Sequence, residues 1–104
     1  MASLDVRVVS PQKIVFEGEA SGLVAPAWDG QVGVLPGHAP LLALLGVGEL
    51  TVERPGGGSD GFHVAGGVLK VERDKVTVLT EYAGTAPPAE VPSGTVVYPE
   101  DVAI

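Results

Sequence analysis

The chain has 104 residues, which is enough for one small domain. Hydrophobic residues make up 45% and charged residues 18%, as in a folded chain rather than a disordered one. The absence of cysteine excludes a disulfide framework, a thiol nucleophile and a thiolate metal site. The net charge of −7 argues against binding to nucleic acid or to an anionic membrane surface, because both rely on clustered basic residues.

Apolar and polar residues alternate along most of the chain, as they do in half-buried strands. The 15 glycines and 9 prolines separate these runs at intervals of about ten residues. The pattern predicts an all-β fold, a β-sandwich or barrel of short strands. The alternating runs are residues 4–8, 14–20, 50–53, 62–64, 68–72 and 75–80.

Three local features interrupt the alternation. Arg73-Asp74 predicts a tight hairpin turn, and residues 55–61 predict a glycine-rich hairpin loop. Gly66-Gly67 indicates a bulge or sharp bend within a strand pattern. After Pro40 comes an apolar run, which we interpret as one short helical turn closed by Gly46. That run consists of Leu41, Leu42, Leu44 and Leu45.

The last part of the chain has a different character. Residues 84–104 include Pro87, Pro88 and Pro92 and show no clear periodicity. We therefore predict a domain at residues 1–83, followed by a proline-rich linker and tail. Residues 95–98 have the composition of one short strand.

No arrangement of residues predicts catalysis, a metal site or a cofactor site. His38 lacks a serine or threonine anywhere in residues 22–50 that it could activate, so a structural or contact role is favoured. His63 alternates with apolar neighbours and is expected to face solvent. Gly56-Gly57-Gly58 lacks the Lys-Ser/Thr ending of a phosphate-binding loop. We expect a binding or structural module rather than an enzyme.

Residues 30–42, which read GQVGVLPGHAPLL, carry a more specific signal. They resemble the G-E-x-G-I-L-P-G-H-A-P-L-L signature of the epsilon subunit of F-type ATP synthases, called delta in mitochondria. Four further segments resemble that family in the same order. They are residues 9–19, 48–50, 64–71 and 75–81. The resemblance covers about residues 4–83.

The resemblance implies a flattened antiparallel β-sandwich of about ten strands in the central stalk of the enzyme. Such a domain binds the gamma subunit and contacts the polar loops of the c-ring, and it couples proton flow to ATP synthesis without catalysing a reaction. Gln31 would face the c-ring loops, where the family often has an acid. His38, Leu42 and Ala43 would lie near gamma, together with Ser10.

The same resemblance implies a peripheral place on the cytoplasmic side of the cell membrane, reached only through the complex. The N-terminus has no secretory signal pattern, and the longest apolar stretch, residues 39–47, is too short for a membrane span. Family members usually continue into two inhibitory helices, which can also bind ATP. The prolines after residue 86 predict that this chain lacks that helical arm and its nucleotide site.

Two other functions remain open from the residues alone. A free-standing β-sandwich module for carbohydrate or another ligand would use surface aromatics, of which Trp28 is the only tryptophan. A small hydrolase would use a glutamate or histidine, but no convergent set of residues supports it.

Overall fold

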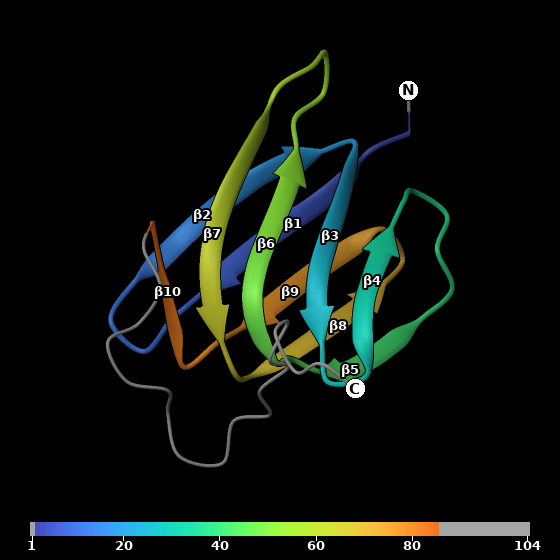
Figure 1. The fold of residues 1–104 in the computed structure, drawn as a ribbon. Helices are drawn as coiled ribbons and strands as arrows, with labels where there is room; N and C mark the ends of the chain where they lie inside the picture. The colour runs from blue at the N-terminus through green and yellow to red at the C-terminus, as the bar shows by residue number, and fades with distance from the viewer. Residues whose placement is uncertain (1, 86–104) are drawn as a thin grey trace, which may run out of the picture.

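The computed structural model describes residues 2–85, which form ten β-strands in two facing sheets (Figure 1). The all-β sandwich and its ten short strands are therefore confirmed. The strands are β1 (Leu4–Val9), β2 (Ile14–Ala20), β3 (Gly22–Ala27), β4 (Gly30–Val34), β5 (Leu41–Leu44), β6 (Val47–Glu53), β7 (Ser59–Ala65), β8 (Val68–Glu72), β9 (Lys75–Leu79) and β10 (Tyr82–Gly84).

Each sheet has five strands. Sheet A has the order β2-β1-β9-β8-β5, and sheet B has the order β10-β7-β6-β3-β4. Sheet B lies toward the viewer in Figure 1, with sheet A behind it and its strands running obliquely. The chain passes from sheet A to sheet B after β2 and returns at β5, so both edges of each sheet are built from different parts of the sequence.

One pair of strands departs from the antiparallel expectation. β1 and β9 run parallel, with Val6 opposite Val76 and Val8 opposite Val78. Parallel neighbours need a long crossover connection. Here that connection includes four of the five strands of sheet B, which are β3, β4, β6 and β7, because the chain leaves sheet A after β2 and enters β9 only after completing β8.

The predicted helical turn at the leucine run is wrong. Residues Leu41–Leu44 form β5, the edge strand that pairs with β8. A short apolar run does not distinguish a helix from a buried strand by itself. The backbone groups of β8 require a partner on this side, and the extended form of β5 provides one while burying alternate side chains.

The core lies between the two sheets and is made of alternate residues from both. Leu4, Val6 and Val8 of β1 are fully buried, whereas Asp5 and Arg7 are exposed. Phe16 of sheet A and Phe62 of sheet B meet across the core with ring centroids 6.0 Å apart. Such aromatic pairs add to the stability that apolar burial provides. The two sheets therefore form one closely packed unit.

Two of the predicted turns are confirmed and explain how the sheets are shaped. Arg73 and Asp74 both have positive φ angles, 50° and 62°, as a two-residue hairpin turn of type I′ requires. Gly67 has φ 114°, and a Cβ atom there would lie 1.9 Å from the carbonyl oxygen of Leu79. Only glycine permits this close approach of the β7–β8 connection to the end of β9.

The expected linker and tail lie almost wholly outside the described residues, as does the expected strand at residues 95–98. Across residues 2–85, no helix is long and apolar enough to cross a membrane.

Candidate partner-binding face

The five residues expected to contact partners are distributed over both sheets. Gln31 lies on β4, the edge of sheet B, and is exposed. Leu42 and Ala43 lie on β5, the edge of sheet A. His38 lies on the connection between these two edges, and Ser10 follows β1. The fold therefore places Ser10, Leu42 and Ala43 on one sheet and Gln31 on the other.

Neighbouring residues of β5 face opposite ways. Leu42 is 71% exposed and lies opposite Lys70 of β8. Ala43 lies opposite Leu69, which is fully buried. Directly opposed residues of an antiparallel pair point to the same face, so Ala43 belongs to the inner face and Leu42 to the outer one. Leu42 also lines a shallow groove between Pro40 and Glu72.

An unbroken row of apolar side chains crosses the outer face of sheet A. The strand register sets Leu44 opposite Val68, Val68 opposite Leu79, Leu79 beside Val9, and Val9 opposite Ile14. Leu44, Leu79 and Ile14 are each about half exposed, at 58%, 52% and 48%. We call these five residues the apolar row; they are Ile14, Val9, Leu79, Val68 and Leu44.

The rest of this outer face is mostly polar, which makes the apolar row distinctive. The next row along the strands includes Lys70, Thr77, Arg7 and Glu17. The Arg7 Nε and Glu17 Oε2 atoms are 3.4 Å apart in an exposed ion pair. The solvent-exposed face of an antiparallel sheet usually carries polar side chains. An apolar row that crosses all five strands is typical of a surface that another molecule covers.

Ser10 lies beside the end of this row but turns its side chain away from solvent. It is 7% exposed, and its hydroxyl donates to the Lys13 carbonyl oxygen at 3.3 Å. Its backbone N–H donates to the same oxygen at 2.9 Å. Ser10 thus closes the β1–β2 turn and lines a groove with Val9 and Leu79.

His38 forms two local hydrogen-bond contacts. Its Nδ1 atom is 2.6 Å from the carbonyl oxygen of Ala39, and its backbone N–H donates to the Leu35 carbonyl oxygen at 3.1 Å. Within the described part of the chain, no group of three or more His, Asp or Glu residues is placed to hold a metal ion. The surroundings of His38 fit a contact residue on a braced loop.

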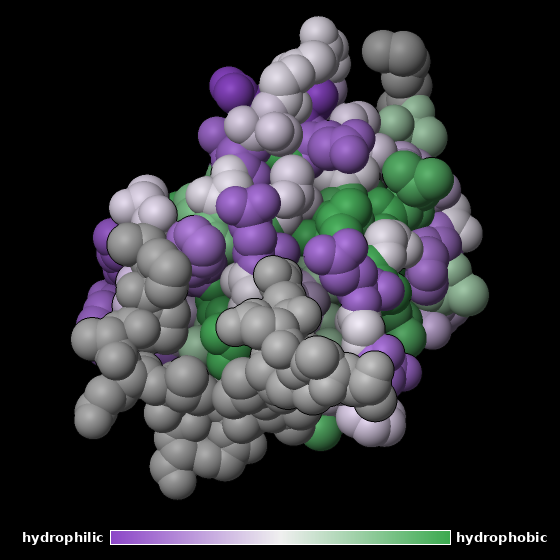
Figure 2. Space-filling view, in the orientation of Figure 1, coloured by the Kyte–Doolittle hydropathy of each residue, from purple (hydrophilic) through white to green (hydrophobic). Residues whose placement is uncertain are grey.

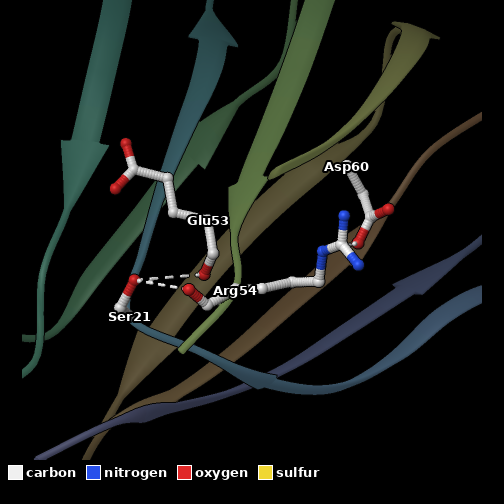
Figure 3. A network of polar contacts seen from close by, with 4 residues as sticks. All are labelled: Ser21, Glu53, Arg54 and Asp60. Carbon is white, nitrogen blue, oxygen red and sulfur yellow. Dashed lines mark hydrogen bonds and ion pairs between the residues drawn. The ribbon is translucent and has the colours of Figure 1, made fainter. Parts of the chain in front are cut away.

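A polar network lies at the β6–β7 hairpin (Figure 3). The Ser21 hydroxyl lies 3.3 Å from the carbonyl oxygen of Glu53 and 3.4 Å from that of Arg54. The Arg54 Nε atom is 3.4 Å from Asp60 Oδ2. A strand, β7, follows the glycine loop, so this loop lacks the helix N-terminus of a phosphate cradle. The network holds the shape of the hairpin.

The outer face of sheet B differs from that of sheet A. Figure 2 shows it toward the viewer, with hydrophilic side chains gathered around the β6–β7 hairpin. Glu49, Thr51 and Glu53 of β6 alternate there with buried Leu50 and Val52. His63 pairs with Glu49 and is half-buried. Among the described aromatic residues, only Trp28 is exposed, at 51%.

The row escaped sequence reasoning because its members come from five separate strands. Asp5, Arg7 and Val9 share the outer phase of β1, and Lys75, Thr77 and Leu79 share that of β9. The sequence did contain one sign of the row: Val9 and Leu79 are apolar residues at the end of an otherwise polar set of outward-facing positions. The register that joins these residues could not be read from one sequence.

The fold agrees with comparisons to known proteins. Residues 3–86 match the family described as the ATP synthase delta/epsilon chain, β-sandwich domain. The chain belongs to this family.

Individual relatives agree with that assignment. An ATP synthase epsilon chain of Psychrobacter cryohalolentis is 46% identical over 83 residues, which are 80% of this chain and 60% of the relative. One of Alkalilimnicola ehrlichii is 44% identical over 86 residues, 83% of this chain and 61% of the relative. This chain thus spans about three-fifths of the length of these curated relatives.

Solved structures show the same fold. A chain in the Euglena gracilis mitochondrial ATP synthase, in an OSCP/F1/c-ring structure, matches with a TM-score of 0.76 and 25% identity. That match covers 84% of this chain and 54% of the other. A chain in the Tetrahymena thermophila central stalk/c-ring structure matches with a TM-score of 0.66 and 16% identity, covering 77% and 64%.

Proposed function

We propose that this domain is a non-catalytic rotor part of an ATP synthase, which binds the gamma subunit through the outer face of sheet A. The observation that carries the proposal is the apolar row. Its exposed leucines and isoleucine lie on the same sheet as Leu42, and Leu79 lines a groove together with Ser10. Covering this row would remove its apolar surface from water, which stabilises a complex.

The c-ring contact falls on a different part of the molecule in this proposal. Gln31 is exposed on β4, directly after the turn that contains Trp28 and Asp29. Its amide can donate and accept hydrogen bonds with polar loops, although it cannot form the ion pair of an acidic residue. The two named structural relatives belong to assemblies with a c-ring, which supports this partner.

The mechanical role follows from having two partners on one packed domain. A closely packed core transmits displacement with little deformation. Sheet A would hold gamma while the β3–β4 turn meets the c-ring, so that rotation of the ring reaches gamma and drives ATP synthesis. The domain would thus lie on the cytoplasmic side of the cell membrane, peripheral and attached through the complex.

The expected contribution of one side chain follows from its exposure. Complete burial of a leucine contributes about 1.5–3 kcal/mol. Leu79 is 52% exposed in the free chain, so covering it contributes about 1 kcal/mol. Leu79→Ala should weaken binding to gamma about fivefold. Leu79→Asp should weaken it by about tenfold or more, because its neighbours Val9 and Val68 offer a buried carboxylate no partner. Leu42→Asp should also weaken it, but by less, because the new carboxylate would lie opposite Lys70.

The test is a titration of purified gamma with the wild-type chain and these variants. Val24→Asp is the matched control, because Val24 lies on the outer face of sheet B, opposite Thr51. It should bind like the wild type, and far-UV circular dichroism should show every variant folded. If the wild type does not bind gamma, the proposed function is wrong. If all variants bind equally, gamma does not use sheet A.

A further inference from the structure

The connection between β4 and β5 is fastened to a distant turn by a single side chain. The N–H of Gly37 donates a hydrogen bond to Asp74 Oδ1 at 2.7 Å. The two residues are 37 positions apart, and they bring the edge of the molecule beside β4 together with the β8–β9 turn. A hydrogen bond to a carboxylate is shorter and stronger than one between neutral groups.

The backbone of Asp74 is held in a defined conformation, which limits where its carboxylate can lie. Asp74 and Arg73 both adopt the left-handed backbone region that the two-residue turn requires. The carbonyl oxygen of Asp74 also accepts a hydrogen bond from the N–H of Asp5 at 2.8 Å. The turn is therefore joined to β1 through its backbone, which leaves the side chain available for the connection.

Gly37 lies in the middle of the segment that this bond restrains. The segment begins after β4 with exposed Leu35, continues through His38, and leads into β5 with Leu42. Gly37 has φ 87°, and apart from its chain neighbours no residue has an atom within 4 Å of where its Cβ would be. The hydrogen bond to Asp74 joins this point of the connection to another part of the fold.

We propose that Asp74 is a positioning residue, whose carboxylate holds the residue 35–40 connection so that His38 and the start of β5 are presented to the partner of sheet A. The partner part of this inference rests on the proposed binding of gamma. The restraint of the connection by Asp74 does not depend on that binding and is measurable in the isolated chain.

Two substitutions at position 74 distinguish the effect of the carboxylate from that of the turn conformation. Asp74→Gly removes the acceptor and suits the left-handed backbone, so the turn should remain intact. Asp74→Asn keeps an amide oxygen as acceptor and tolerates the same backbone region. Arg73→Gly is the matched control, since it changes the same turn without removing the carboxylate.

Hydrogen exchange of the Gly37 amide, measured by NMR, tests the restraint. Asp74→Gly should speed this exchange roughly three- to tenfold, as expected for the loss of one hydrogen bond. Asp74→Asn should give a smaller increase, and Arg73→Gly should leave the exchange rate unchanged. An unchanged rate in Asp74→Gly overturns the inference, whatever the result with gamma.

Titration with gamma tests the positioning role. Asp74→Gly should bind several-fold more weakly than the wild type, with Asp74→Asn between them. If Gly37 exchange rises but affinity for gamma is unchanged, Asp74 does not position the contact. If the wild type fails to bind gamma, the proposed function and the positioning role both fall, while the exchange rates still decide whether Asp74 restrains the connection.

Discussion

Gly67 gives the sharpest test of how the two sheets are joined. Its φ angle is 114°, and a Cβ atom added there would lie 1.9 Å from the Leu79 carbonyl oxygen and 2.6 Å from the Thr80 Cα. Real Cβ atoms essentially never come closer than 3.0 Å to another heavy atom. Both obstructing atoms belong to the backbone, so no side chain can move aside to relieve the clash.

The chain contains a matched control for the backbone strain alone. Gly30 has a similar φ of 128°, but nothing lies within 4 Å of its Cβ position. Gly30→Ala should therefore cost only the strained conformation, about 1–3 kcal/mol. Gly67→Ala should cost that amount and also force β9 away from the β7–β8 connection, for a loss of about 4 kcal/mol or more.

Urea denaturation, followed by circular dichroism, measures both free energies of unfolding. Gly67→Ala would also disturb a backbone hydrogen bond, because the Gly67 carbonyl oxygen accepts the N–H of Leu45 at 2.9 Å. We expect Gly67→Ala to be unfolded or to have a midpoint far below that of Gly30→Ala. Equal midpoints for the two variants would refute the argument that close approach, rather than φ alone, requires glycine at position 67.

Two further predictions use single side chains. The hydroxyl of Thr80, which is 5% exposed, lies 2.8 Å from the carbonyl oxygens of both Gly66 and Tyr82. Thr80→Val should lower the free energy of unfolding by about 1–3 kcal/mol, whereas Thr80→Ser should stay near the wild type; a neutral Thr80→Val in urea denaturation would contradict this. Trp28 is half exposed on the β3–β4 turn, which we assign to the c-ring contact. Its fluorescence should shift to the blue when the c-ring loops cover this turn but should not respond to saccharides; the opposite pattern would favour a carbohydrate-binding module.

Local sequence patterns predicted those parts of the fold that local interactions determine. The turn at Arg73-Asp74 was predictable because only two polar residues separate two alternating runs, which is the length of a tight hairpin loop. The strands on both sides of it were predictable from alternation, with Val76 and Val78 buried and Lys75 exposed. In each case the signal lies within a few consecutive residues.

The incorrect prediction of a helical turn at β5 shows that local patterns do not determine the structure of every segment. Leu41 to Leu44 have no strong preference of their own between a helical turn and a strand. Their extended form depends on β8, whose Val71 and Leu69 lie opposite them but follow about 25 to 30 residues later in the sequence. A sequence reading that treats each segment separately cannot include this partner.

The same dependence on register explains why the proposed contact face is only partly visible in the sequence. Leu42 could be found from its place in a family motif, and the structure then sets it on the outer face. The family motifs give no contact role to Leu44, Leu79 or Ile14. They become one surface only because the parallel pairing of β1 with β9 brings Val9 beside Leu79. A shift of β9 by one residue would turn Leu79 inward and expose Val78 instead. Gly67 lets the β7–β8 connection lie directly against the backbone of Leu79, so a substitution that moves this connection would also move Leu79 within the apolar row.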